Sequence, residues 1–322
     1  MLAGVTTVSS TGSMRIPSGP TEHRGGRGRG IIAGGNTPSN LDTMTRIQIS
    51  TAGNSVDFGN LTTARRGCGS STNSSSTRGV FNNGFVSAYT TAIDYVTISS
   101  DGGASDFGDR QNADGNSTGL SNGVRGLLAG GINASDVWTN VIEFFTIATT
   151  GNSSDFGDMT RAQSHRASAA SPTRGVMMNG LYSGPTYNDE IDYVTIATTG
   201  NALDFGDTTQ ARGVGSGGGS ATRALAAGGI TPSKVDTIDY ITIATLGNST
   251  DFGNLTTARQ HHASVNNSIR CVLACGDTPT LVNTIDYVTI ASTGNATDFG
   301  DDTIARSNQP SSASDAHGGL GD

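Results

Sequence analysis

Short apolar segments separated by polar turns recur along this chain at nearly constant spacing. Each repeat begins with an Arg and a short apolar run that ends in Gly, followed by a variable loop. A segment such as Ile285–Ile290 (Ile-Asp-Tyr-Val-Thr-Ile) comes next, then a Thr-Gly-Asn turn and the tripeptide Asp-Phe-Gly. Alternating apolar residues bounded by turn residues indicate β-strands, so each repeat is expected to hold four short strands.

The repeat occurs six times. Counted from the first residue of Asp-Phe-Gly, the intervals are 49, 49, 49, 47 and 47 residues, and the tripeptides begin at Asp57, Asp106, Asp155, Asp204, Asp251 and Asp298. A period of about 50 residues with four strands is typical of a β-propeller blade. Each blade is apolar on both faces, as in Tyr193, Val194 and Ile196, and can bury these faces only between two neighbours. The sequence therefore predicts an all-β fold, a six-bladed propeller with four antiparallel strands per blade.

The strand count also predicts how the ring closes. Second, third and fourth strands are each present six times, but only five first strands lie inside the chain, near residues 67–76, 113–122, 165–171, 214–221 and 261–267. The sixth must come from a terminus. Ser311, Ser312 and Ala313 after Arg306 resemble a first strand, so we expect the C-terminus to complete the first blade, with residues 15–25 as the alternative.

This closure divides the chain into two parts. Residues 1–28 form a Gly- and Arg-rich N-terminal arm, and residues 29–322 form the propeller. His317 follows Asp298 by 19 residues, as Arg270 follows Asp251, which places His317 at the corresponding point of its repeat.

The composition of the chain argues against several classes of function. Charged residues are 14% of the chain and hydrophobic residues 34%, against about 25% and 45–50% in ordinary globular domains, and 46 of 322 residues are Gly. A helical enzyme is therefore not expected. The net charge of -8 argues against duplex nucleic acid as a partner. No apolar stretch is long enough to span a membrane and residues 1–18 do not resemble a secretory signal, which favours a soluble protein made in the cytoplasm and no membrane insertion.

The cysteines predict neither a disulfide nor a metal site. Cys271 and Cys275 lie four residues apart on one expected strand, roughly 13 Å, which is beyond disulfide reach, and Cys68 is distant in sequence. We interpret all three as small buried residues.

Several motifs resemble Kelch repeats. The segment 259–264 (Arg-Gln-His-His-Ala-Ser) is similar to the first Kelch strand, 226–229 (Ala-Ala-Gly-Gly) to the second and 238–241 (Ile-Asp-Tyr-Ile) to the third, and Phe252 stands where Kelch repeats have Trp. The match covers about residues 29–317. The near-identical Ile-Asp-Tyr-Val-Thr-Ile-Ala-Thr-Thr-Gly-Asn units look most like the Kelch-like virion proteins of tailed bacteriophages, especially aquatic or cyanobacterial ones.

Two sets of arginines recur. The first set stands where the innermost hairpin enters the second strand, and it comprises Arg29, Arg78, Arg125, Arg174, Arg223 and Arg270. Such a ring could hold an anion, but we favour a structural role in which each guanidinium links blades through carbonyls or Asp. The second set is expected to pair with Asp94, Asp192, Asp239, Asp286 and the Asp of Asp-Phe-Gly, and it comprises Arg65, Arg161, Arg212, Arg259 and Arg306.

Asp-Phe-Gly itself is a magnesium-binding motif in protein kinases. Six copies, one Lys and no glycine-rich or catalytic loop reject that interpretation. Calcium bound by Asp155 with Asp158, or by Asp298 with Asp301 and Asp302, is a weaker alternative to turn capping. The histidines do not predict a metal site, and no cofactor is expected.

The loops between second and third strands break the repetition. They are eleven residues long in repeats three and four and nine in the others. The aromatic residues that gather in repeats two to four are candidates for a binding face that meets a protein or the apolar face of a sugar, and they are Phe85, Tyr89, Trp138, Tyr182 and Tyr187. They could equally pack on their own loops.

The basic run 23–29, with Arg24, Arg27 and Arg29, lacks aromatics and is weak evidence for nucleic acid; it suits an arm that attaches to an acidic neighbour. Together with the phage resemblance, this predicts a non-enzymatic virion protein, carried on capsid or tail for decoration, adhesion, or host or partner recognition. Its partners would be other virion proteins and a host-surface glycan or protein. The alternative is a lectin-like carbohydrate-binding propeller that uses Trp138, Tyr182 and Tyr187.

Overall fold

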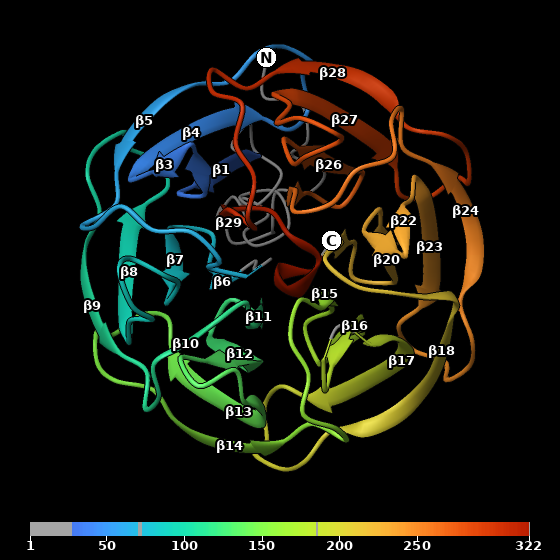
Figure 1. Cartoon of the computed structure of the whole chain (residues 1–322), viewed down its shortest axis with the longest axis horizontal. Coiled ribbons are helices and arrows are strands. Elements are labelled where there is room, and N and C mark those ends of the chain that lie inside the picture. The colour runs from blue at the N-terminus through green and yellow to red at the C-terminus, as the bar shows by residue number, and fades with distance from the viewer. Residues whose placement is uncertain (1–27, 70–72, 185, 322) are drawn as a thin grey trace, which may run out of the picture.

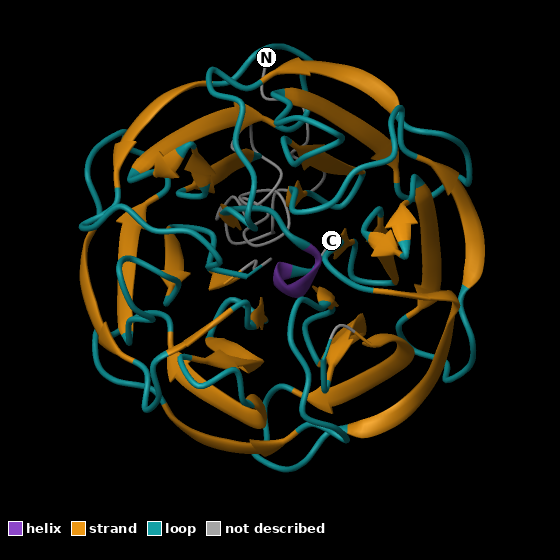
Figure 2. Ribbon diagram, in the orientation of Figure 1, coloured by secondary structure: helices purple, strands orange, loops and turns teal. Residues whose placement is uncertain are grey.

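Six four-stranded blades surround a central axis in the computed structural model of the chain (Figure 1). The structure describes residues 28–69, 73–184 and 186–321. Within them the regular elements are strands, with one short 3-10 helix, η1 (Gly318–Leu320), near the axis (Figure 2). The predicted fold class, a six-bladed propeller with antiparallel blades, is confirmed.

The strands run outward in sequence order in blades 2 to 6, and in blade 1 the last strand of the chain takes the innermost place. The innermost strands are β29 (Ser311–Ser314), β6 (Asn73–Ser74), β10 (Asp114–Gly115) with β11 (Thr118–Ser121), β15 (Ala167–Ala170), β19 (Ser216–Gly219) and β25 (Ala263–Asn266). The second strands are β1 (Arg29–Ala33), β7 (Arg78–Asn82), β12 (Arg125–Asn133), β16 (Arg174–Tyr182), β20 (Arg223–Ala227) and β26 (Arg270–Ala274).

The outer half of each blade holds the most regular part of the repeat. The third strands are β4 (Thr43–Gln48), β8 (Ala92–Thr97), β13 (Trp138–Thr146), β17 (Thr186–Thr195), β23 (Thr237–Thr242) and β27 (Thr284–Thr289). The edge strands, which carry Asp-Phe-Gly, are β5 (Val56–Asn60), β9 (Ser105–Asp109), β14 (Ser154–Asp158), β18 (Leu203–Arg212), β24 (Thr250–Asn254) and β28 (Thr297–Asp301). Blades 1 and 5 add small hairpins, β2 (Asn36–Thr37) with β3 (Ser39–Asn40) and β21 (Ile230–Thr231) with β22 (Ser233–Lys234).

The C-terminus closes the ring, as predicted. Strand β29 pairs antiparallel with β1, with Gly30 opposite Ser314 and Ala33 opposite Ser311, so the first blade combines both ends of the propeller. The alternative strand at residues 15–25 lies outside the described residues. Because β29 fills the inner position of blade 1, the last and first blades are joined covalently through the chain and through a four-residue ladder.

Apolar packing occurs between blades. Each of the six buried clusters among the described residues combines side chains from two adjacent blades. In one of them Phe107 of blade 2 meets Phe145 of blade 3, with ring centroids 5.1 Å apart. Val80 faces that cluster, whereas its neighbour Phe81 faces blade 1, because successive strand residues point to opposite faces. The expectation that every blade is apolar on both faces is therefore met.

The tripeptide Asp-Phe-Gly recurs because each copy contacts a turn of the next blade. In every blade the Phe is buried, and its carbonyl accepts a hydrogen bond from the Gly in the turn between the third and fourth strands of the next blade, as from Gly200 to Phe156 at 2.8 Å. The turn presses on the Gly of the tripeptide, so a Cβ at Gly157 would lie 2.5 Å from the Gly200 carbonyl oxygen. The same contact between Gly53 and Phe299 seals blade 6 to blade 1 at 2.7 Å.

Small polar residues fill the inner wall. Hydroxyl groups on one inner strand donate to carbonyls on the next, as from Ser314 to Asn266 and from Ser74 to Ser314, both at 2.7 Å. Larger residues do not fit, since a Cβ at Gly217 would meet the Ser168 backbone at 2.9 Å. The Ser, Gly and Asn of these strands are therefore required by the close approach of six strands at the axis.

The C-terminal residues cross the end of the axis at the hairpins between first and second strands. His317 is buried and its Nε2 lies 2.9 Å from the Ser74 carbonyl, and Gly318 and Gly319 pack against the backbone of Ser220 and Ser121. η1 thus touches several blades (Figure 1). The expectation that His317 matches Arg270 is wrong: the chain leaves the blade after β29 and turns into the axis.

Candidate functional site

Buried ion pairs lie where each edge strand leads into the next blade. Among the described residues six arginines with almost no exposed surface each contact a buried carboxylate, in the pairs Arg65–Asp94, Arg110–Glu143, Arg166–Asp192, Arg212–Asp239, Arg259–Asp286 and Arg306–Asp302. Most of the acids come from the centre of a third strand, and in four pairs that acid is the predicted Asp. These guanidiniums also donate to blade carbonyls, as Arg212 does to Ala226 at 3.0 Å.

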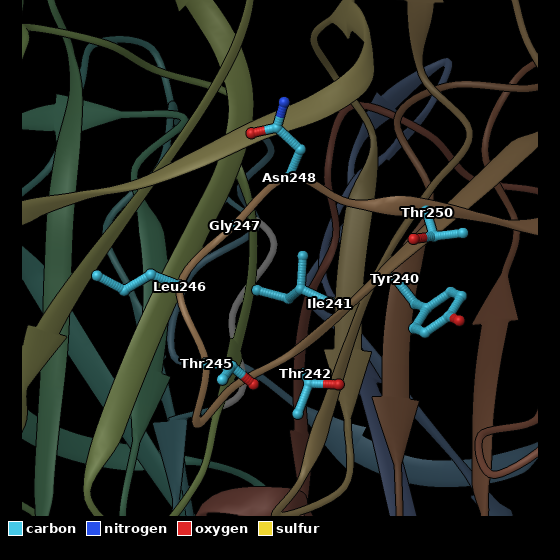
Figure 3. A pocket seen from close by; sticks show the side chains of 8 residues that line it. All are labelled: Tyr240, Ile241, Thr242, Thr245, Leu246, Gly247, Asn248 and Thr250. Atoms are coloured by element: carbon cyan, nitrogen blue, oxygen red, sulfur yellow. The ribbon is translucent and has the colours of Figure 1, made fainter.

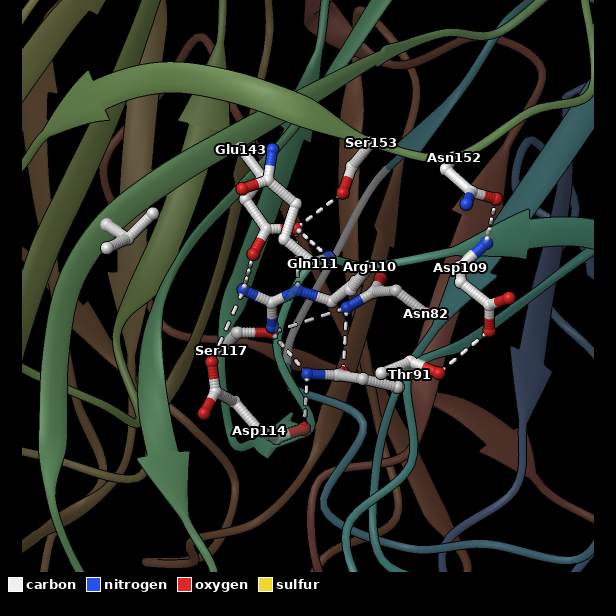
Figure 4. Close-up of polar contacts among 12 residues, drawn as sticks. Asn82, Thr91, Asp109, Arg110, Gln111, Asp114, Ser117, Glu143, Asn152 and Ser153 are labelled. Carbon is white, nitrogen blue, oxygen red and sulfur yellow. Dashed lines mark hydrogen bonds and ion pairs between the residues drawn. The ribbon is translucent and has the colours of Figure 1, made fainter.

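Where the repeat departs from its pattern, a nearby residue supplies the missing charge. Blade 1 has Thr45 in the Asp position, and Arg306 takes its carboxylate from Asp302 at 2.9 Å instead. In blade 3, Arg110 lies between Glu143 and Asp114 (Figure 4). A pair that is kept while its residues change position is needed by the fold, because a lone buried charge is costly.

Two expectations for these pairs are wrong. Arg161 is exposed and contacts Glu190, and Arg166 takes its place beside Asp192, because the chain in blade 4 brings Arg166 into the core. The Asp of Asp-Phe-Gly does not pair with this set: Asp57 and its five equivalents are exposed on the edge strands. Among the described residues no group of three or more His, Cys, Asp or Glu side chains is placed so that it could hold a metal ion.

The first arginine set links neighbouring blades. Each guanidinium donates to a main-chain carbonyl at the end of the next blade's third strand, as Arg174 does to Ile243 at 2.7 Å. Five of the six also stack on the Tyr or Phe of their own third strand, with centroid distances of 4.4–4.5 Å. Arg29 is the exception: blade 1 has Arg46 in the aromatic position, and Asp101 contacts both arginines. These contacts are those of the favoured structural role.

The five candidate aromatics do not form one face. All are half-buried. Trp138 begins β13 opposite Ile132, and Tyr182 and Tyr187 belong to the long β16–β17 hairpin, so the longer loops of blades 3 and 4 are extended β-ribbons. Tyr182 is covered by Arg161 at 4.5 Å. Phe85 and Tyr89 form an edge-to-face pair closer to the axis, with centroids 5.4 Å apart.

A ring of six residues narrows the axis at the end where the first strands begin. One residue comes from each blade, always nine positions after the Phe of Asp-Phe-Gly: Gly67, Asn116, His165, Val214, His261 and Asn308. All six have positive φ, between 54° and 63°. Backbone hydrogen bonds of 2.7–3.1 Å join them in the order Asn308, Gly67, Asn116, His165, Val214, His261. We call this set the axial ring.

A hollow of about 190 Å³ opens over the axial ring. Its lining combines five members of the ring with Arg66 and the aromatic pair, and the residues are Arg66, Gly67, Phe85, Tyr89, Asn116, His165, His261 and Asn308. A wider depression of about 550 Å³ adjoins it, shares His261 and Asn308, and extends over Asp277 and Leu281. We call the smaller one the axial hollow. Phe85 and Tyr89 are the predicted candidates that reach it; Trp138, Tyr182 and Tyr187 do not line it.

Hydrogen bonds orient the two imidazoles of the axial hollow. His261 Nδ1 lies 2.8 Å from Asp277 Oδ1, and Lys234 also contacts that carboxylate. Although burial opposes it, hydrogen bonds from His261 and Lys234 lower the pKa of Asp277 to about 2. Asp277 is therefore ionised at neutral pH, and His261 Nδ1 donates to it. His165 Nδ1 lies 2.8 Å from Ser164 Oγ, and burial, with a smaller effect of His261, lowers the pKa of His165 to about 3.

The axial ring has only a weak signal in the sequence. Aligned on the Phe of Asp-Phe-Gly, the ninth following position changes from blade to blade, although most of the repeat is preserved. Periodicity identifies residues that are repeated, and the residues at this position share no chemistry. Only the left-handed backbone and the convergence at the axis show that the six belong together.

Another hollow, of about 230 Å³, belongs to a single turn. Its lining residues all lie between Tyr240 and Thr250 on β23, β24 and the turn that joins them (Figure 3). This turn has sequence counterparts in the other blades, such as the turn at Gly200.

Three remaining expectations concern cysteines, membranes and the arm. Cys68, Cys271 and Cys275 are buried and unbonded to one another, as expected, and burial raises the pKa of Cys271 to about 12. No helix in the described part of the chain has the length and apolar character for crossing a membrane. Arg24 and Arg27 of the N-terminal arm lie outside the described residues.

No protein-family model matches the chain, and no curated protein matches it. What the fold defines is a class, the six-bladed β-propeller.

Proposed function

We propose that this protein is a non-enzymatic structural component of a tailed-phage virion, mounted on capsid or tail, whose rigid propeller decorates the particle or recognises a host or partner surface. The observation that carries the proposal is that the buried and half-buried arginines are engaged in contacts within and between blades. The six buried arginines and their carboxylates hold blades together, and the half-buried arginines bind the carbonyls of the next blade. Charged side chains thus support a rigid ring, which suits a mounted particle component.

Two features of the sequence support the virion setting. The nearly identical repeats resemble those of phage Kelch-like proteins, and Arg24 and Arg27 precede the first blade, where an arm would attach the ring to an acidic capsid or tail protein. Arg29, the third arginine of the basic run, is instead the first residue of β1 and contacts Ile98 and Asp101 of blade 2. On this proposal the protein is made in the host cytoplasm, acts in the virion, and needs no cofactor.

The test is a protein inventory of purified virions by mass spectrometry, after gradient separation from free host and phage proteins. We expect this chain at a constant ratio to the major capsid protein or to a tail protein across gradient fractions. Its absence from intact particles, or a ratio that changes from fraction to fraction, would overturn the proposal.

A second candidate function is carbohydrate binding, which is compatible with a virion setting. The observation that favours it is the axial hollow, where Phe85 and Tyr89 adjoin amide and imidazole side chains. Aromatic rings beside neutral hydrogen-bonding groups suit a sugar, whose faces are apolar and whose edges carry hydroxyls. A glycan array probed with the full chain tests this function directly.

A further inference from the structure

The six repeats differ in chemistry at the axial ring, which holds one Gly, two Asn, two His and one Val. The flanking elements are preserved: the buried Phe precedes the ring position by nine residues in every blade, and a serine, glycine or alanine-rich inner strand follows it. Packing between blades therefore does not account for the change from Gly67 to Asn116 to His165. A function at the axis does.

The left-handed backbone of the axial ring also points to a function there. A left-handed backbone conformation costs the least free energy for Gly and the next least for Asn. Blades 1, 2 and 3 have Asn308, Gly67 and Asn116 at the axial-ring position. Blades 4 and 6 place His165 and His261 there, and Val214, which is β-branched, stands between them at φ 63°. A β-branched residue in this region is a true conformational outlier, and such outliers concentrate at functional sites.

The chemistry of the axial hollow matches a ligand rich in hydroxyl groups. A neutral imidazole and an amide each offer both a donor and an acceptor, as a sugar hydroxyl requires. With Nδ1 of His261 held by Asp277 and Nδ1 of His165 beside Ser164, neither Nε2 has a hydrogen-bond partner among the described residues. Both imidazoles thus keep one free nitrogen.

The charge and volume of the axial hollow restrict the class of ligand further. Among the described residues no carboxylate lines the axial hollow, and its one permanent cation, Arg66, is stacked on Phe85 at 4.7 Å and donates to Asn40. The ionised Asp277 behind His261 disfavours an anion. About 190 Å³ is below the roughly 300–1,000 Å³ of pockets for drug-sized ligands, which leaves room for one small ring.

We propose that the axial hollow binds one terminal neutral sugar ring, with Phe85 and Tyr89 against its apolar face and His165, His261 and Asn308 at its hydroxyls. The adjoining depression over Asp277 and Leu281 lies where the next residues of a glycan would continue. This inference deepens the carbohydrate-binding candidate and does not depend on where the protein is mounted.

The experiment measures binding of free neutral monosaccharides to the full chain. Saturation-transfer NMR is run with a panel of hexoses, deoxyhexoses and N-acetylhexosamines, and the best binder is titrated into wild type, His261→Asn and Asn308→Ala. His261→Asn gives blade 6 the residue that Asn116 and Asn308 provide at the same position, so the variant keeps the fold. Trp138→Phe is the control, since Trp138 lies outside the axial hollow.

We expect one or more neutral sugars to bind, with affinity reduced about tenfold or more in His261→Asn and Asn308→Ala and unchanged in Trp138→Phe. Failure of every sugar to bind the folded wild-type chain would overturn the inference. So would binding that both axial variants retain, or that Trp138→Phe abolishes. The virion inventory is independent of these results, so failure here leaves the structural proposal standing.

Discussion

The outer strands and the axial ring obey opposite rules. In the outer strands the same residues recur because each performs the same contact. In all six blades the Phe is buried and the Gly admits the next blade's turn, and in four blades an Arg pairs with the Asp of the third strand. In the axial ring the backbone is the same in every blade, with φ between 54° and 63°, while the side chains differ.

The difference teaches how a repeat protein separates folding from binding. A contact between neighbouring blades must be satisfied six times, so its residues are repeated. A side chain at the axis has no equivalent neighbour to satisfy, because six different blades contribute to one place. The side chains at the axis can therefore differ between blades without disturbing the contacts between blades, and they can contact a ligand.

The largest effect on stability is expected when β29, the strand that closes the first blade, is removed. Deleting residues 311–322 removes β29 and η1, leaves β1 without its inner partner, and opens the interface with blade 6. We expect no cooperative unfolding transition in denaturant, measured by circular dichroism. A truncated chain that unfolds cooperatively at the wild-type midpoint would show that the ring does not depend on this closure.

The next test separates a buried repeated carboxylate from an exposed one. Asp239→Ala leaves Arg212 in the core without its partner at 2.9 Å, and we expect a loss of about 3–5 kcal/mol in the free energy of unfolding. Asp251→Ala removes the exposed Asp of Asp-Phe-Gly in the same blade and should change it by less than about 0.5 kcal/mol. Equal losses would contradict the assignment of the two roles.

A pair of glycines tests the close approach between blades. Gly157 and Gly151 have similar φ, 145° and 153°, but a Cβ at Gly157 would lie 2.5 Å from the Gly200 carbonyl oxygen, whereas a Cβ at Gly151 meets nothing within 4 Å. We expect Gly157→Ala to lower the free energy of unfolding by about 1–3 kcal/mol more than Gly151→Ala, by chemical denaturation. If the two variants lose the same amount, backbone conformation alone explains the repeated Gly.

A smaller effect concerns pH at the axis. Burial lowers the pKa of His165 to about 3 from an ordinary value near 6.5, so the unfolded chain binds a proton that the folded chain does not as pH falls between these values. Stability contributed by the neutral imidazole is present above pH 6.5 and is lost toward pH 3. His165→Asn should therefore lose less free energy of unfolding between pH 7 and 4.5 than wild type, by on the order of 1 kcal/mol. Parallel losses would contradict a neutral, buried His165.

The sequence predicts the ring well because the ring is built of repeated contacts. Periodicity gives six blades, and the missing first strand gives the closure by residues 311–314. It fails where the repeat is irregular: the place of Arg161 is taken by Arg166, and His317 turns into the axis, since neither shift follows from the pattern of the other blades.

The candidate binding site was predicted only in part. Phe85 and Tyr89 reach the axial hollow, but the longer loops also predict Trp138, Tyr182 and Tyr187 at the binding face, and the structure places these three on extended hairpins. The axial ring could not be found by looking for shared chemistry, because its members have none. They converge only through the shape of the closed ring.

We expect the axial imidazoles of His165 and His261 to contribute little to the stability of the propeller. The measurement that tests it is the free energy of unfolding of the double variant His165→Asn, His261→Asn at pH 7, obtained by chemical denaturation. Because Asn116 and Asn308 hold the same left-handed position, we expect a value within about 1 kcal/mol of wild type. A loss of several kcal/mol would make the histidines structural and contradict the separation of the repeated ring from a variable axial site.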